Sequence, residues 1–284
     1  MVTQTPKRAA PDLRAVDSVP PLLCLEDGPP VETVNQGGTA PILLICEHAS
    51  NRMPKSLGEL GLDAELLQSH IAFDPGAEPV ARLMSKALDA PLILQRCSRL
   101  VYDCNRPPEA PSAVPARSEI FDIPGNGNLS AAERKARAEA LYMPFHQAIA
   151  DRLDHIAATG ELPAIVTIHS FTPIFHGQKR SVELGILHDR DARLADEMLK
   201  LAGEESIPAV YRNEPYGPED GVTHTLQRHA LPRGLLNVMI EIRNDLIKDR
   251  AGQARLGADL ARMVSQGLDR LGRSAAPENR QAAS

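Results

Sequence analysis

The sequence predicts an α/β protein, a three-layer sandwich in which helices cover both faces of a mostly parallel central sheet. Two observations support this class: short continuous runs of aliphatic residues recur along the chain, and segments with helical periodicity separate them. A strand buried on both faces forms a continuous apolar run, and strands that alternate with helices are typical of parallel sheets. Because the chain has no Trp and only 3% aromatic residues, the core is expected to be aliphatic.

Five aliphatic runs are the expected strands, and four periodic segments are the expected helices. The strands are residues 42–46, 92–94, 164–168, 184–187 and 236–240, and the helices are residues 78–88, 130–157, 191–201 and 251–271. The second helix has a capping box, because Ser130 is followed by Glu133 three positions later. Ligands of such sheets bind beyond the carboxyl ends of the strands, so the residues that follow each run are the functional candidates.

The expected organisation is a single α/β domain at residues 39–272. An extended or partly disordered N-terminal arm, residues 1–38, precedes it, because this part of the chain is rich in Pro, charged and small residues and ends in two glycines. A disordered tail is expected at residues 273–284.

Charge and composition argue against several classes of protein. The formal net charge is -6 and the pI is about 5.9, whereas binders of nucleic acid or of membrane surfaces usually need a basic face. No apolar run approaches the roughly 20 residues that span a bilayer, and the N-terminus lacks the apolar core of a secretory leader. The four cysteines have no CxxC spacing and are expected to be reduced. A cytoplasmic protein is the expectation.

Three of the aliphatic runs lead into side chains that bind metals or transfer protons. Glu47 and His48 follow the first run, His169 follows the third, and Glu241 follows the last. In a parallel sheet these ends meet at one edge, so the side chains are expected to converge there. Imidazole and carboxylate groups suit zinc or a similar divalent ion. One His after a strand is more often a packing residue, but three such ends favour a metal site.

Two further segments contribute candidates. Asp74 stands just before a helix, where it is either an N-cap or a metal ligand. Arg99 and Arg106 flank a short predicted strand that a pair of prolines ends. An Arg guanidinium is suited to bidentate binding of a carboxylate, and the alternative is a salt bridge to a neighbour such as Asp103.

Six segments together resemble the N-formylglutamate amidohydrolase family, and they occur in the family's order. They are CEHASN (46–51), FDPGA (73–77), SRLVYDCNRP (98–107), IHSF (168–171), DGVTH (220–224) and EIRND (241–245). The resemblance implies hydrolysis of an amide bond in a small-molecule N-acyl amino acid, namely of N-formyl-L-glutamate to formate and L-glutamate. It also implies a fold similar to that of zinc carboxypeptidases and other phosphorylase/hydrolase-like proteins.

The resemblance implies roles for individual residues. His48 and His169 would bind Zn²⁺ or another divalent metal, and Glu241 would be the general base and acid. Asp74 is the expected further ligand, with Glu47 as the alternative. The alternative stays open because His48 is not followed, three positions later, by the Glu of the carboxypeptidase pattern.

Further residues are candidates for contact with the substrate, and the resemblance implies the first two of them. Asn105 and Arg106 are similar to the pair that holds the substrate carboxylate in carboxypeptidases, and Arg99 is expected to stabilise the oxyanion. The remaining candidates for substrate contact are His146, in the family-like segment YMPFH (142–146), Arg180 and His224. For His146 the alternative is a partly exposed polar residue of a helix, and for Arg180 it is a solvated loop.

Other functions stay open from the sequence. The same metal site suits deacylation of another N-acyl amino acid or a small peptide. A nucleophilic hydrolase would use Cys46 or Ser170 with a His, although Cys46 and His48 follow a strand in which neighbours point to opposite faces. A module that binds acidic metabolites through Arg99 and Arg106, without metal, is the non-enzymatic alternative. The sequence does not indicate an oligomeric state.

Overall fold

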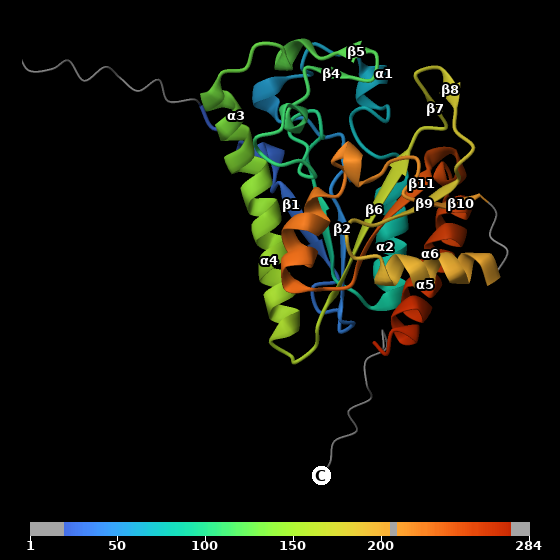
Figure 1. Ribbon diagram of the computed structural model, residues 1–284. Helices are drawn as coiled ribbons and strands as arrows, with labels where there is room; N and C mark the ends of the chain where they lie inside the picture. Colours follow the sequence, from blue (N-terminus) through green and yellow to red (C-terminus); the bar gives the residue numbers. More distant parts are fainter. Residues whose placement is uncertain (1–19, 205–208, 274–284) are drawn as a thin grey trace, which may run out of the picture.

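A seven-stranded sheet forms the centre of the computed structural model, which describes residues 20–204 and 209–273 (Figure 1). The strand order is β1-β3-β2-β6-β11-β9-β10. The strands are β1 (Val31–Val34), β2 (Ile42–Cys46), β3 (Leu92–Gln95), β6 (Ala164–Phe171), β9 (Leu184–Leu187), β10 (Val210–Arg212) and β11 (Asn237–Arg243). Within the described strands of this sheet, only the β1–β3 and β9–β11 pairs are antiparallel, so the predicted mostly parallel sheet is confirmed.

Helices cover both faces of this sheet, as the three-layer prediction requires. One face carries α2 (Ala77–Leu88), α5 (Arg193–Glu204) and α6 (Arg250–Arg270), and the other carries α4 (Met143–Ala157) (Figure 1). Strand β2 shows why the predicted runs are apolar throughout: Ile42 and Leu44 pack in the core cluster of the first face, and Leu43 and Ile45 pack in that of the second.

The predicted helix at residues 130–157 contains a π-helical turn. Ser130 caps α3 (Ala131–Arg137) with the predicted capping box, and the turn Ala138–Tyr142 joins α3 to α4. Small elements lie at the carboxyl ends of the parallel strands (Figure 1). They are α1 (Ala64–Leu67), the β4–β5 hairpin (Arg117–Ser118 and Phe121–Asp122) and the β7–β8 hairpin (Ile174–Phe175 and Gln178–Lys179).

Two expectations differ from the structure. The short strand expected after Arg99 is a turn, because Ser98 accepts hydrogen bonds from the backbone of Leu100 and Val101 and so competes with a strand ladder. The boundary expected at residue 39 is not where the sheet begins, because β1 pairs antiparallel with β3 at the sheet edge. The rest of the predicted arm, 1–19, and the predicted tail beyond residue 273 lie outside the described residues.

None of the helices in the described ranges has the length and apolar character needed to cross a bilayer.

Candidate active site

The candidate site is built at the carboxyl edge of the sheet, from three strands and one loop. His169 on β6 and Glu241 on β11 are register partners. Ile168 and Ile240 pack on the α2 face, so the alternation of the strands turns His169 and Glu241 to the opposite face. His48 follows β2, and Asp74 lies in the loop before α2, where its backbone N–H donates to the carbonyl of His48.

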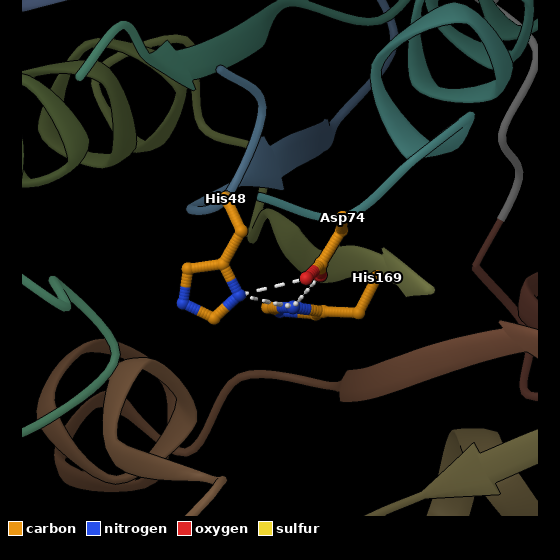
Figure 2. A group of neighbouring side chains, drawn as sticks. All are labelled: His48, Asp74 and His169. Atoms are coloured by element: carbon orange, nitrogen blue, oxygen red, sulfur yellow. Dashed lines mark hydrogen bonds and ion pairs between the residues drawn. The ribbon is translucent and has the colours of Figure 1, made fainter. Parts of the chain in front are cut away.

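His48, Asp74 and His169 form a compact buried cluster (Figure 2). His169 Nδ1 lies 2.9 Å from Asp74 Oδ2 and 3.2 Å from His48 Nδ1, and His48 Nδ1 lies 3.3 Å from Asp74 Oδ2. Each residue therefore turns one potential ligand atom towards the same point. The backbone N–H of Ser170 also donates to Asp74 Oδ2, at 3.3 Å, which restrains the carboxylate.

Both imidazoles have a carboxylate at their other ring nitrogen. His48 Nε2 lies 2.8 Å from Asp103 Oδ1, and His169 Nε2 lies 3.0 Å from Glu47 Oε2. Metal-binding histidines commonly have such carboxylate partners, which set the ring orientation and the tautomer. Glu47, the alternative ligand, therefore stands behind His169 and outside the cluster.

The cluster fits a divalent metal in donor type and in spacing. Two imidazoles and a carboxylate, with a fourth position open, make up a common catalytic zinc site. Ligand atoms about 2.0–2.1 Å from a tetrahedral ion lie roughly 3.3 Å apart, close to the distances found here. Burial alone would lower the pKa of His169, but Glu47 and Asp74 raise that pKa well above its ordinary value. A raised pKa favours the protonated form of His169. A bound metal would displace the extra proton, because a ligating imidazole is neutral.

A cavity of about 340 Å³ opens on the cluster. His48, Asp74 and His169 line it together with Glu241, Arg99 and Arg106, so most of the predicted site residues meet there. Its apolar wall consists of Phe171, Phe175, Val222 and Met239. The volume is at the lower end of the range of small-molecule sites, which favours a small substrate.

Glu241 has the environment of a proton-transfer group. Its side chain is buried, and among the described residues Oε2 has no hydrogen-bond partner. Burial raises the pKa of Glu241 to about 7. A carboxyl group with a pKa near neutrality is suited to general acid–base catalysis.

The two arginines at the cavity differ in their partners. Arg99 bridges two carboxylates, with Nη1 3.4 Å from Asp74 Oδ1 and Nη2 2.8 Å from Asp103 Oδ2. Arg106 Nη1 donates to the carbonyls of Gly221 and Asn105, at 2.7 and 3.0 Å. Both of these acceptors of Arg106 are uncharged, in contrast to the two carboxylates that hold Arg99.

Asn105 lines the cavity, with both ends of its amide bonded to backbone. Its Nδ2 donates to the carbonyl of Val222, and its Oδ1 accepts from the N–H of Thr225 at 3.0 Å. Asn105 therefore ties the segment around Arg106 to the loop at residues 222–225.

Three predicted substrate-binding residues stand one layer behind the cavity and do not line it: His146, Arg180 and His224. His146 is hydrogen-bonded to His229 and to the carbonyl of Cys104. The guanidinium of Arg180 lies over the rings of Phe175 and Tyr216, and His224 is bonded to the hydroxyl of Tyr142. The structure thus brings these residues close to the site without placing them in it.

The geometry does not support a nucleophilic Cys or Ser. Cys46 packs in the apolar cluster on the α2 face, away from the cavity, and burial raises the pKa of its thiol well above the ordinary value. Ser170 lines the cavity, but its hydroxyl donates to the carbonyl of Pro75 at 2.8 Å. The described contacts of Ser170 include no His that would activate it.

Sequence analysis missed several residues of the site. Asp103, expected from the sequence only as a salt-bridge partner of an arginine, also contacts Nε2 of His48. His70 Nε2 lies 2.8 Å from Glu119 Oε2 at the cavity, and Tyr216 lines the cavity as well. These three residues lie in loops with no local pattern, so no signal in one sequence singles them out.

The protein is an α/β sandwich with a candidate catalytic metal site. In this site two imidazoles and a carboxylate converge at the carboxyl edge of the sheet. The family model of N-formylglutamate amidohydrolases matches residues 40–248. The chain therefore belongs to the N-formylglutamate amidohydrolase family, as the resemblance of its motifs predicts.

Two solved structures are similar to the chain. The gene product Atu2144 from Agrobacterium tumefaciens is 54% identical, with a TM-score of 0.87 over 89% of this chain and 100% of that chain. An N-formylglutamate amidohydrolase from Ralstonia eutropha JMP134 is 20% identical, with a TM-score of 0.59 over 86% of this chain and 99% of that chain. At this identity the second structure shows the shared fold alone. No protein among those of curated function matches the chain.

Proposed function

We propose that the protein hydrolyses the amide bond of an N-acyl amino acid in a metal-dependent reaction, with N-formyl-L-glutamate as the substrate and formate and L-glutamate as the products. Membership of the family supports the reaction class. The observation that carries the proposal is the meeting of the cluster His48, Asp74 and His169 with Glu241 in one small cavity.

His48, Asp74 and His169 would hold the metal, with Glu47 and Asp103 fixing the two imidazoles from behind. When bound, a divalent metal supplies Lewis acidity towards the amide carbonyl and lowers the pKa of a water towards ~7.

Glu241 is the group that moves the proton. It lies beside His169 across the β6–β11 pair, and its Oε2 is free of partners among the described residues. We assign it two steps: it accepts a proton from the attacking water at its carboxylate, and it then delivers this proton to the leaving nitrogen.

The two arginines have separate tasks in this proposal. Arg106 binds the carboxylate of the substrate, because its own hydrogen bonds among the described residues go to two backbone carbonyls and not to a carboxylate. Arg99 is held beside the cluster by two aspartates, which gives it a fixed position. A fixed cation beside the reacting carbonyl stabilises the oxyanion without reorganisation during the reaction.

The apolar wall of the cavity favours a second candidate within the same class. Phe171, Phe175, Val222 and Met239 line the cavity with apolar side chains. This surface suits deacylation of an N-acyl amino acid with a larger acyl group.

The test of Glu241 is its replacement by Gln, which keeps the shape and removes the proton acceptor. We expect Glu241→Gln to bind metal as the wild type does and to lose about 10²- to 10⁴-fold in kcat, the range typical of a general base or acid. The measurements are the metal content and the rate of formate release from N-formyl-L-glutamate. The control is Glu139→Gln on the exposed side of the π turn, which should leave kcat unchanged. A Glu241→Gln protein with the wild-type kcat would remove Glu241 from the mechanism.

A further inference from the structure

Behind the cavity lies a pair of buried histidines that the proposed mechanism does not use. His146 on α4 and His229 in the π-helical turn Leu226–Ala230 stack with ring centroids 5.0 Å apart and an interplanar angle of 16°. His146 Nδ1 lies 2.8 Å from His229 Nε2, and His146 Nε2 lies 2.9 Å from the carbonyl oxygen of Cys104. Both side chains are buried, so these contacts are shielded from water.

The contacts fix the tautomers of the pair. Burial lowers the pKa of His146 to about 2 and that of His229 to about 3, so each ring is neutral and carries one N–H. Because a carbonyl oxygen only accepts, His146 Nε2 donates to Cys104 and His146 Nδ1 accepts. His229 Nε2 must then be the donor to His146. Two hydrogen bonds therefore run in one direction, from His229 through His146 to the backbone of Cys104.

Cys104 lies in the segment that joins the metal cluster to the substrate side of the cavity. The preceding residue, Asp103, holds His48 Nε2 at 2.8 Å. Two residues further on, Arg106 is the cation that we assign to the substrate carboxylate. An anchor on the Cys104 carbonyl therefore restrains both of these side chains through three peptide units.

A second contact links the elements that carry the two histidines. Tyr142 ends the π turn Ala138–Tyr142, and its hydroxyl lies 2.8 Å from Nε2 of His224, in the helical residues directly before the other π turn. π-Helical turns are rare and occur frequently at functional sites. Here His229 lies in one of them, and His146 lies on α4, one turn after the other, with its Nε2 on the Cys104 carbonyl.

We propose that His146 and His229 are positioning residues, which hold the segment at 103–106 through the Cys104 carbonyl and thereby orient His48 for the metal and Arg106 for the substrate. This inference rests on the proposed function, since it requires metal at His48. Neither residue lines the cavity, so their effect is indirect.

The test compares two amides at each position. In His146→Gln, the side-chain NH₂ can take the place of the Nε2 donor, whereas the shorter side chain in His146→Asn reaches only the place of Nδ1. Loss of a partner behind a metal ligand typically costs 10- to 100-fold in metal affinity. We therefore expect His146→Asn to raise the Zn²⁺ dissociation constant by about 10-fold and to raise KM, and His146→Gln to stay within about 3-fold of the wild type.

Zinc affinity is measured on the metal-free protein by competition with a chromogenic chelator, and the absorption spectrum of bound Co²⁺ reports the ligand geometry. Leu153→Ala is the matched control, because it removes a buried side chain from the same helix and lowers Tm without touching Cys104. We expect it to leave the zinc affinity unchanged. If His146→Asn does not fold, His229→Asn against His229→Gln makes the same comparison at the donor end of the pair.

Equal zinc affinity and KM in the Asn variants and the wild type would overturn the positioning role. So would an equal loss of affinity in Leu153→Ala, because the effect would then follow stability alone. Failure of the proposed function has a different signature, namely a wild-type protein that binds no zinc. That result would also overturn the proposal that the histidine pair orients His48 for a metal.

Discussion

At the scale of single residues, the choice of ligand atom at the candidate site has a physical cause. His48 and His169 both turn Nδ1 towards the cluster because Asp103 and Glu47 occupy their Nε2 sides. A carboxylate at one ring nitrogen favours the tautomer that leaves the other nitrogen free to bind. Glu47 is adjacent to His48 in sequence, yet its carboxylate lies against the imidazole of His169.

The sequence pattern predicted which types of side chain meet at the sheet edge. It predicted the positions of individual side chains within the site less well. The placement of His48, Asp74, His169 and Glu241 around one cavity follows from strand ends in a parallel sheet. The position of Glu47 depends instead on how the backbone turns after β2, and that turn has no signature in the sequence. His146 was predicted at the substrate because a family-like motif does not distinguish a lining residue from one behind the wall.

The role of Arg106 leads to a prediction on substrate binding. We expect Arg106→Met to raise KM by about 10- to 100-fold with a smaller change in kcat, because a hydrogen bond to a charged group contributes about 1.5–3 kcal/mol. The measurement is the steady-state kinetics of N-formyl-L-glutamate hydrolysis. Arg190→Met removes the same charge from an almost fully exposed site and should leave KM unchanged. Similar KM values for both variants would show that Arg106 does not bind the carboxylate.

At the scale of secondary structure, the elements with strong patterns were predicted and the edge strands were not. All five aliphatic runs are strands, and the four periodic segments are helices. Strands β1 and β10 are short and partly exposed, so neither forms a continuous apolar run. Residues 31–34 alternate only weakly, and their place in the sheet depends on the antiparallel pairing with β3, which is a tertiary contact.

The turn that connects Asp74 to α2 depends on one glycine. Gly76 has φ +82°, and a Cβ at this position would lie 2.6 Å from the carbonyl oxygen of Ile247. A residue other than Gly is strained at such a φ, and here it would also collide with backbone. Gly177 in the β7–β8 hairpin has φ +74° with nothing within 4 Å of the added Cβ, so it isolates the effect of strain alone.

We therefore expect Gly76→Ala to lower the free energy of unfolding by more than Gly177→Ala does. Strain at a positive φ costs about 1–2 kcal/mol, and the contact with Ile247 adds a similar amount or more. Urea denaturation of the two variants beside the wild type gives the comparison. If both substitutions lowered the free energy of unfolding equally, the close approach of Gly76 to Ile247 would not contribute to stability.

At the scale of the whole molecule, the fold brings together residues that are far apart in the chain. Parallel β2, β6 and β11 lie side by side, so the residues at their carboxyl ends share one edge. The class of fold and this edge could be predicted because they follow from periodicity and strand direction. The loops that complete the cavity, including those of Glu119 and Tyr216, could not, because their positions are set by contacts between distant segments.

The central claim is that this edge holds a catalytic metal, and metal analysis joined to an activity assay tests it most directly. The protein is purified without a His-tag, its bound metal is measured, and formate release from N-formyl-L-glutamate is followed before and after chelation. We predict about one divalent metal per chain, loss of activity on chelation, and recovery when zinc is added back. A protein that binds no metal and hydrolyses the substrate at the same rate in the presence of chelator would contradict the account.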